Sequence, residues 1–348
     1  MRLITCVTLL AAMGAASVCA AEPIRMATMS PPGSPSRFVY DRLLDYVESR
    51  TQGEYVIEPY FNGELGPEES YFNAMRRGRI QLSAVSGQGI GTVIPEFAIL
   101  RAPYLFESFE ELVFVYDYYV RTLMADLFAE KEMVHLEWAA NGWENVYARK
   151  PIRVPDDVIG YRIRVPLEPN AALFFGSAGA DVIQIPFTDI IQSLQTGLID
   201  GGESTTLMYV QAGIYSEAPH LTQTQHGFSL AVYAANKKWF DATPAHLQII
   251  LRDAYMRAPE AFPTLRRQTQ QMLDSAHDKD VQLHTLSPEQ RAQWRTTTAR
   301  AVEEIISRAG GKSYDIYESI LAGKADFAAQ NHGAGSGEWP LETTPPHD

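Results

Sequence analysis

The sequence has 348 residues, of which 46% are hydrophobic and 20% charged, and it contains 24 Gly, 21 Pro and only 2 Cys. This composition is typical of a folded globular protein and excludes a disordered chain, a collagen-like chain and a scaffold held together by disulfides. A chain of this length favours two lobes of about 100 to 200 residues each over a single core. The net charge of −13 argues against nucleic acid or an anionic membrane surface as the partner.

The first 21 residues predict a cleaved secretory signal. Arg2 gives a positive start, residues 3–17 are an apolar run broken only by Thr, Gly and Ser, and residues 18–21 end in small side chains. An apolar run of about 15 residues is short for a membrane-spanning helix, which needs roughly 20. Cys6 and Cys19 both lie in this segment, so the mature chain has no disulfide and no cysteine metal site. We therefore expect export to the periplasm.

Strand-like and helix-like segments alternate after residue 22. Strands are predicted over residues 24–29, 55–60 and 80–85, and helices are predicted to begin at Ser36 and Pro67. This βαβαβ order predicts a parallel sheet with helices on both faces, and ligands of such sheets lie at the carboxyl ends of the strands. The loops after Met29 and Val85 are therefore candidate walls of a ligand site.

A second α/β lobe is predicted in the middle of the chain. A helix over about 109–129 and a strand over 134–139 lead to residues 163–202, which repeat the strand and helix order. From residue 243 the chain is predicted to be mostly helical, with Pro263 kinking a long helix that spans the lobes. The Gly-rich and Pro-rich end of the chain predicts a disordered tail.

These segments predict an α/β fold of two lobes, each a mostly parallel sheet flanked by helices. The predicted boundaries are residues 1–21 for the signal, 22–141 with 230–269 for the first lobe, 142–229 with 270–328 for the second lobe, and 329–348 for the tail. The strand crossings near 141–147 and 228–234 are the expected hinges.

One stretch of the sequence is more specific than the rest. It reads Pro-Asp-Asp-Val-Ile-Gly-Tyr-Arg-Ile-Arg-Val-Pro over residues 155–166, then Ile-Pro-Phe-Thr-Asp over 185–189 and Leu-Gln-Thr-Gly-Leu-Ile-Asp-Gly-Gly-Glu over 194–203. Gly-Glu-Leu-Gly at 63–66 and Ala-Pro-Tyr-Leu-Phe at 102–106 belong to the same pattern. Together these motifs resemble the DctP-type periplasmic solute-binding proteins of TRAP transporters, over about residues 24–325.

The resemblance implies a two-lobed periplasmic binding protein of the type II-like fold. Its lobes close on a small organic acid and then dock on a permease of small and large membrane subunits that is driven by an ion gradient. In that family the arginine of the Ile-Arg-Val motif holds the ligand carboxylate, and here this residue is Arg164. A guanidinium suits the role because it is always charged and matches a carboxylate with two parallel bonds. Strand alternation puts Arg162 on the same face, so only the motif register favours Arg164.

The same register implies further ligand-binding residues. Phe187 stands where the family packs an aromatic ring against the ligand, with simple core packing as the alternative. Ser204 replaces the Asn that commonly reaches the same carboxylate, and the shorter serine would lose that contact or bridge it through water. Leu167, directly after the arginine motif, is another candidate. On the first lobe, Ser30 and Ser86 match ligand-facing positions, and the small residues around Ser86 predict a neutral wall.

Trp143 and Glu144 occupy the place where many relatives have a second basic residue. An acid beside Arg164 would repel a second ligand carboxylate, which disfavours a dicarboxylate. A monocarboxylate with a cationic, amide or hydroxyl group is favoured instead, and Trp143 would stack on a cation or a flat group.

Two other roles of Glu144 stay open at this point. Together with Glu203 it could hold Na⁺ or Ca²⁺ beside the ligand, as some relatives hold a metal ion. Alternatively, it pairs with a basic residue of the lobe such as Arg149. Apart from such an ion, no cofactor is expected.

An enzyme is not expected. The sequence has no Gly-x-Ser-x-Gly elbow and no His-Glu-x-x-His motif, and its eight histidines are scattered. The glycines of residues 87–91 lack the spacing of a dinucleotide-binding loop. A sensor subunit that reports to a membrane receptor and the binding protein of an ABC-type importer remain as alternatives. The motif register from Arg164 to Glu203 disfavours the importer.

Overall fold

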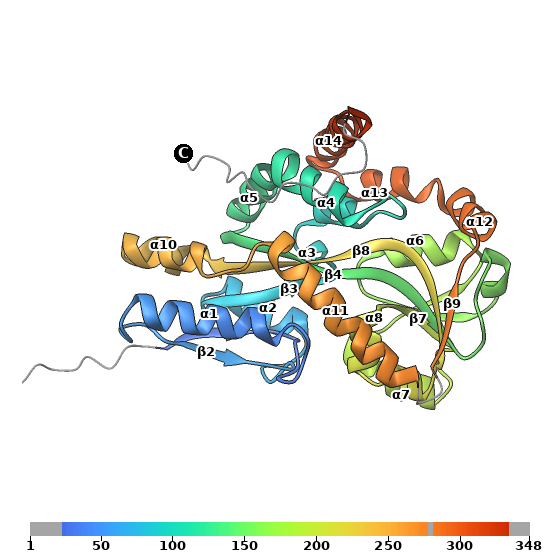
Figure 1. The fold of residues 1–348 in the computed structure, drawn as a ribbon, viewed down its shortest axis with the longest axis horizontal. Helices are drawn as coiled ribbons and strands as arrows, with labels where there is room; N and C mark the ends of the chain where they lie inside the picture. Colours follow the sequence, from blue (N-terminus) through green and yellow to red (C-terminus); the bar gives the residue numbers. More distant parts are fainter. Residues whose placement is uncertain (1–22, 278–280, 334–348) are drawn as a thin grey trace, which may run out of the picture.

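The computed structural model describes residues 23–277 and 281–333 (Figure 1). The predicted signal, residues 1–21, lies outside the described residues, and so does the chain from residue 334 on. Within the described ranges, no helix is both long and apolar enough to cross a membrane.

One sheet connects the two lobes. Its nine strands in the described residues are β1 (Ile24–Ala27), β2 (Ile57–Tyr60), β3 (Leu82–Ser86), β4 (Met133–Ala148), β5 (Arg162–Val165), β6 (Asp181–Gln184), β7 (Gly201–Thr205), β8 (His220–Asn236) and β9 (Gln282–Thr285). The strand order is β2-β1-β3-β8-β4-β7-β5-β6, and β9 pairs with β8. The first lobe therefore holds β1 to β3 and the second lobe β5 to β7.

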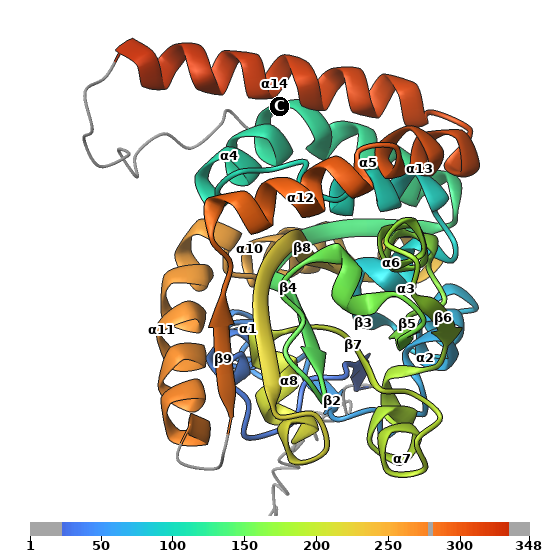
Figure 2. The same cartoon turned by 90° about the vertical axis from the view of Figure 1, so that its right-hand side faces the viewer.

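The parallel pairs are those that the βαβ order predicted. β1 is parallel to β2 and β3, and β5 is parallel to β6 and β7. β4 and β8 are antiparallel to each other and run the length of the sheet from one lobe to the other (Figures 1 and 2). β4 was predicted to end near residue 139, but Gly142 adopts a φ of +115° at a register shift, and the strand continues to Ala148.

Helices cover both faces of the first-lobe sheet. They are α1 (Arg37–Arg50), α2 (Glu68–Arg76), α3 (Gly87–Gly91), the 3₁₀ helix η1 (Pro95–Arg101), α4 (Phe109–Val115), the π-helical segment η2 (Tyr116–Val120) and α5 (Arg121–Glu130). In α1 the apolar side chains of Val39, Leu43 and Val47 recur every four residues and are buried against one face of the sheet. The other face packs on η1, α4 and α5 around Trp138 and Tyr116.

Shorter elements surround the second-lobe strands. They are the 3₁₀ helix η3 (Pro155–Val158), α6 (Pro169–Ser177), the 3₁₀ helix η4 (Phe187–Asp189), α7 (Ile190–Gln195), α8 (Thr206–Gln211) and the 3₁₀ helix η5 (Ile214–Ser216). Two buried clusters form this lobe's core, one around Phe174 and Trp294 and the other around Tyr147 and Tyr209.

The helical segment after β8 differs in detail from its prediction. It contains α9 (Lys237–Ala242), α10 (Ala245–Asp253) and α11 (Ala258–His277). The chain breaks between α10 and α11, whereas Pro263 lies inside the second turn of α11, where its missing N–H removes one bond to the first turn. α11 packs on both β4 and α8, so a long helix with an internal proline does span the lobes, as predicted (Figure 1).

Three helices end the described chain: α12 (Pro288–Thr298), α13 (Ala301–Ala309) and α14 (Ser313–Gly333). α14 buries Ile316 and Ile320 against α4 and η2, and Figure 2 shows it lying across these elements. It therefore packs on the first lobe, whereas the predicted boundaries placed it in the second. Residues 329–333, predicted to begin the tail, continue this helix.

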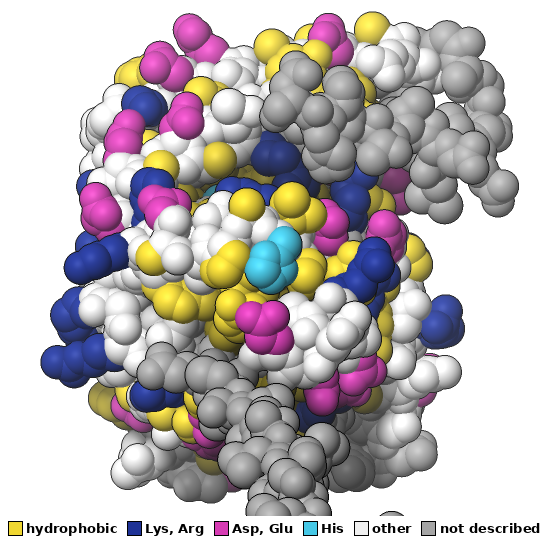
Figure 3. All heavy atoms as spheres, turned by 90° about the vertical axis from the view of Figure 1, so that its left-hand side faces the viewer, with side chains coloured by type: hydrophobic (Ala, Val, Ile, Leu, Met, Phe, Trp, Pro, Cys, Tyr) yellow, Lys and Arg dark blue, Asp and Glu magenta, His cyan; other side chains and the backbone are white. Residues whose placement is uncertain are grey.

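The surface in Figure 3 shows acidic and basic side chains interspersed with polar and hydrophobic ones. The charges on this face are mixed in sign, unlike the single-sign stripe of a nucleic-acid-binding face.

Candidate functional site: a cavity between the lobes

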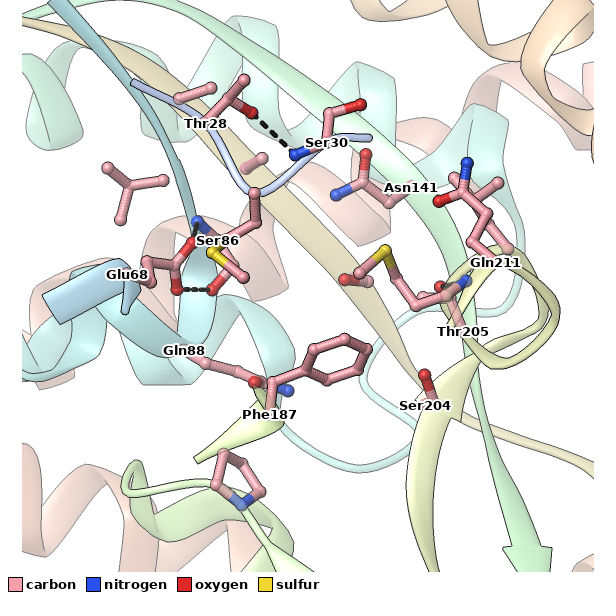
Figure 4. Close-up of a pocket in the computed structure, with 18 of the residues that line it drawn as sticks. Thr28, Ser30, Glu68, Ser86, Gln88, Asn141, Phe187, Ser204, Thr205 and Gln211 are labelled. Carbon is pink, nitrogen blue, oxygen red and sulfur yellow. Dashed lines mark hydrogen bonds between the residues drawn. The ribbon is translucent and has the colours of Figure 1, made fainter. Parts of the chain in front are cut away.

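A cavity of about 170 Å³ lies between the two lobes. Its first-lobe wall comes from the segment after β1, the start of α2 and the end of β3, and its second-lobe wall comes from the segments after β5 and β6 and the start of α8. Figure 4 shows Thr28, Glu68 and Ser86 on one side and Ser204, Thr205 and Gln211 on the other. The loops after Met29 and Val85 thus line the cavity at the carboxyl ends of parallel strands, as predicted.

Arg164 lies in the second-lobe wall, and its guanidinium is only partly satisfied. The residue is 2% exposed, and its Nε donates to the carbonyl of Ile185 at 2.8 Å. Among the described residues, no other hydrogen bond or ion pair involves this side chain. Burial lowers the pKa of Arg164. The nearby Tyr147, Glu203 and Glu144 act in the opposite direction, but their effect is smaller than that of burial. The two Nη groups are therefore placed to donate to an anion in the cavity.

Arg162, the other arginine of the motif, pairs with a carboxylate outside the cavity. It lies at the exposed start of β5 and donates from Nε and Nη2 to the two carboxylate oxygens of Asp200, both at 2.7 Å. It does not line the cavity. The structure therefore distinguishes the two arginines, which strand alternation could not do: Arg164 lines the cavity and Arg162 does not.

Phe187, Leu167 and Ser204 also line the cavity. Phe187 begins η4, and its ring points into the cavity in Figure 4. The residue also packs against the second-lobe core, so it both faces the cavity and contributes to the core. Leu167 is 46% exposed and Ser204 is 5% exposed, so the leucine lies at the rim and the serine in the interior.

Glu144 points into the cavity from β4, but it already has a partner. Its Oε1 lies 3.6 Å from Nη2 of Arg101, and both side chains are nearly fully buried. Arg101 also pairs with Glu168 at 2.9 Å. The structural pairing considered for Glu144 therefore exists, but with Arg101 and not with Arg149, which donates to the carbonyl of Leu194.

Glu203 is the second buried carboxylate of the cavity, and His226 holds it. Nε2 of His226 lies 2.8 Å from Oε2 of Glu203, while Nδ1 of His226 lies 2.8 Å from the hydroxyl of Thr224. The pKa of Glu203 is lowered overall. Burial alone would raise it, but the hydrogen bond from His226 and the nearby positive charges have the larger combined effect. Burial and the charge of Glu203 together raise the pKa of Glu144 to about 7.

The residues do not fit a metal site at Glu144 and Glu203. Each of these carboxylates is paired, with Arg101 and His226 respectively. Across residues 23–277 and 281–333, no group of three or more His, Cys, Asp or Glu side chains could hold a metal ion.

Trp143 was predicted to face the ligand, but the structure does not place it in the cavity wall. Its ring packs on Phe228 at a centroid distance of 3.7 Å and contacts the first-lobe core, and it does not line the cavity. Adjacent residues of a strand point to opposite faces, so Trp143 turns away from the cavity because Glu144 turns toward it.

The first-lobe wall is more acidic than predicted. Ser30 and Ser86 line it as expected, and the hydroxyl of Ser30 is hydrogen-bonded to the hydroxyls of Ser34 and Ser36. Glu68 and Glu69 at the start of α2 line the same wall, which is therefore not neutral. Glu68 accepts from the backbone N–H of Ser86 at 2.8 Å and from its hydroxyl.

The glycines of α3 make room for the charged side chains around the cavity. A Cβ on Gly89 would lie 2.6 Å from Oε2 of Glu68, and a Cβ on Gly91 would lie 2.9 Å from Cγ of Glu168. A Cβ on Gly87 would collide with Cδ of Arg101. The glycines at positions 87, 89 and 91 therefore leave the space that these charged side chains occupy.

Sequence reasoning missed several residues of this site. Asn141 and Gln211 line the cavity with amide groups, and Nε2 of Gln211 is buried without a partner. A polar residue within a long strand beside Gly142 was a usable signal for Asn141. Arg101 and Glu168 carried no local signal, because each is recognisable only through its partner in the other lobe.

The comparisons with known proteins agree with this architecture. The model of the family described as "Bacterial extracellular solute-binding protein, family 7" matches residues 26–309 of this chain. The C4-dicarboxylate-binding periplasmic protein DctP of Rhodobacter capsulatus is 25% identical over 313 residues, covering 88% of this chain and 92% of that protein. The ectoine-binding periplasmic protein TeaA of Halomonas elongata is 25% identical over 291 residues, covering 82% of this chain and 84% of that protein.

A solved structure shows the same fold. The sugar acid binding protein DctPAm of Advenella mimigardefordensis, in complex with galactonate, superimposes with a TM-score of 0.80 at 26% identity, covering 88% of this chain and 98% of that one. The resemblance carried by the motifs is therefore confirmed, as is the prediction of a binding protein and not an enzyme. The chain belongs to family 7 of the bacterial extracellular solute-binding proteins.

Proposed function

We propose that this protein is the periplasmic receptor of a TRAP transporter, which binds a small organic acid between its lobes and delivers it to the membrane permease. The observation that carries the proposal is the buried Arg164, whose Nη groups have no partner among the described residues and which lines the interlobe cavity. A buried cation without a counterion is costly, and a ligand carboxylate would supply the missing partner. The relatives named for C4-dicarboxylates and galactonate support an acid as the ligand.

The proposed ligand carries one carboxylate. Among the described residues that line the cavity, Arg164 is the only Lys or Arg, whereas four are glutamates: Glu68, Glu69, Glu144 and Glu203. A second ligand carboxylate would face these acids without a positive partner. Hydroxyl and amide groups from residues such as Thr28, Ser204 and Asn141 would bind the remaining polar groups of the ligand.

The test compares two arginines of one strand. Ligand binding is measured by calorimetry on the chain from Glu22 on, with galactonate, 4-hydroxybutanoate and succinate as probes, for wild type, Arg164→Gln and Arg162→Gln. We expect Arg164→Gln to weaken the binding of a monocarboxylate by about 100-fold, since two charge-assisted hydrogen bonds are lost. Arg162→Gln should leave affinity unchanged because Arg162 pairs with Asp200 outside the cavity. Equal losses in both variants, or none in either, would refute the role of Arg164.

A further inference from the structure

The four carboxyl groups of the cavity differ in whether the protein satisfies them. Glu203 is held by His226 and Glu144 by Arg101. Glu68 accepts two hydrogen bonds from Ser86. Each of these three acids therefore has a partner within the protein, although Oε1 of Glu203 is buried without a hydrogen bond.

Glu69 is the exception. It lines the cavity from the first turn of α2 and is partly buried. In the part of the chain that the structure describes, no hydrogen bond or ion pair involves its side chain. The carboxylate is therefore available to a group inside the cavity.

Glu69 and Arg164 face the same cavity from different lobes. Glu69 lies on α2 of the first lobe and Arg164 on β5 of the second, and the two line one cavity. Yet no ion pair joins them, which leaves two opposite charges across a space of about 170 Å³. A molecule with a positive group at one end and a negative group at the other would satisfy both.

We infer that Glu69 binds a cationic group of the ligand, so that the ligand is a zwitterion whose carboxylate lies on Arg164 and whose ammonium lies on Glu69. This inference rests on the proposed function and assigns the ligand class of the same site. Each end of such a ligand contacts a different lobe, and the zwitterion joins the lobes through two charge-assisted hydrogen-bonded pairs. A neutral hydroxy acid satisfies only the arginine, and a dicarboxylate places a negative charge against Glu69.

Three four-carbon acids with different distal groups test this inference. 4-Aminobutanoate, 4-hydroxybutanoate and succinate end in an ammonium, a hydroxyl and a second carboxylate. Their dissociation constants are measured by calorimetry for wild type, Glu69→Gln and Glu64→Gln, and 5-aminopentanoate and 6-aminohexanoate cover longer spacings between the two charges. Glu64→Gln removes the same charge from an exposed residue of the same lobe that does not line the cavity.

We expect the best amino acid of the series to bind at least about tenfold more tightly than 4-hydroxybutanoate, and succinate to bind most weakly. Glu69→Gln should remove the preference for the amino acid, improve the binding of succinate and leave the hydroxy acid within about twofold, while Glu64→Gln changes none of them. Equal binding of amino and hydroxy acids, or an equal loss of both in Glu69→Gln, would overturn the inference while leaving the receptor for organic acids intact. Binding of none of the probes, or binding that Arg164→Gln does not weaken, would overturn the proposed function and this inference together.

Discussion

Arg101 and Glu168 form a buried ion pair between the two lobes, with Nη1 of Arg101 2.9 Å from Oε2 of Glu168 and both side chains at most 3% exposed. Arg101 ends η1 in the first lobe, and Glu168 precedes α6 in the second. Beside the pair, the amide of Asn170 donates to the carbonyl of Ala98 at 2.6 Å. Because Arg101 also pairs with Glu144 in the cavity wall, one guanidinium connects the cavity to the contact between the lobes.

Removing this guanidinium should destabilise the fold in a pH-dependent way. Arg101→Gln leaves Glu144 and Glu168 buried without their positive partner, and we expect a loss of about 3 kcal/mol or more in the free energy of unfolding at pH 8. Burial raises the pKa of each of these carboxyls to about 7, so at pH 6 both can take up protons and the loss should be smaller. Urea denaturation at the two pH values measures both.

Arg308 supplies the control for this variant. It pairs with Glu304 one helical turn away on an exposed surface, and Arg308→Gln should change stability by less than about 1 kcal/mol at either pH. A loss in Arg101→Gln that is as small as in Arg308→Gln would contradict the role of the buried pair.

The glycines of α3 should not tolerate a methyl group. In Gly89→Ala the new Cβ would lie 2.6 Å from Oε2 of Glu68 and 2.8 Å from Cγ1 of Val85, so we expect a cost of about 1–3 kcal/mol from overpacking. Gly176→Ala is the control, because this α6 glycine has no atom within 4 Å of its Cβ position and no positive φ. It should be neutral or stabilise by up to about 1 kcal/mol. Thermal unfolding of both variants distinguishes these effects.

The strand and helix order of the fold could be predicted from the sequence, because apolar alternation and helix start signals are local. The lengths of the long strands could not. Asn-Gly at 141–142 reads as a turn, yet β4 passes through it, since the register shift at Gly142 is stabilised by pairing with β8 and not by its own residues. The packing of α14 on the first lobe likewise depends on contacts distant in sequence.

The candidate site was predictable where a motif fixed the register, as for Arg164 and Phe187, which line the cavity. It was not predictable where charges pair across lobes. Nothing near Glu144 in the sequence points to Arg101, so its role was left open between a cationic ligand group, a metal ion and a structural pair such as one with Arg149. The opposite orientations of Trp143 and Glu144, by contrast, follow from strand alternation alone.

Two buried tyrosines should respond differently to loss of the hydroxyl. The Tyr147 hydroxyl is buried without a partner, so Tyr147→Phe should be neutral or stabilise the protein slightly. The Tyr116 hydroxyl forms a 2.8 Å hydrogen bond with Nε2 of the buried His135, so Tyr116→Phe should cost about 1–3 kcal/mol because it leaves the imidazole unsatisfied. Denaturant unfolding of both variants checks the prediction, and equal losses would contradict it.

Glu144 should make both stability and ligand affinity depend on pH. Its pKa is raised to about 7, chiefly by burial and then by the charge of Glu203. A carboxyl whose pKa is higher in the folded state binds its proton more tightly there, so its contribution to stability is fully present below the unfolded pKa of about 4.3 and is lost as the pH rises through 7. The pKa of Glu168 is raised to about 7 as well and acts in the same direction. The free energy of unfolding should therefore fall between pH 5 and pH 8, and less so in Glu144→Gln.

The same proton should couple to the ligand. A carboxylate on Arg164 adds negative charge near Glu144, which raises the pKa of Glu144 further, so binding takes up a proton in the range around pH 7. The affinity for a monocarboxylate such as 4-hydroxybutanoate should therefore fall several-fold from pH 6 to pH 8. In Glu144→Gln the fall in affinity over this range should be smaller, because this titrating group is gone. Calorimetry in two buffers with different ionisation enthalpies counts the proton directly. An affinity that rises with pH, or a fall that persists undiminished in Glu144→Gln, would assign the titration to another group and leave Glu144 as a permanently charged partner of Arg101.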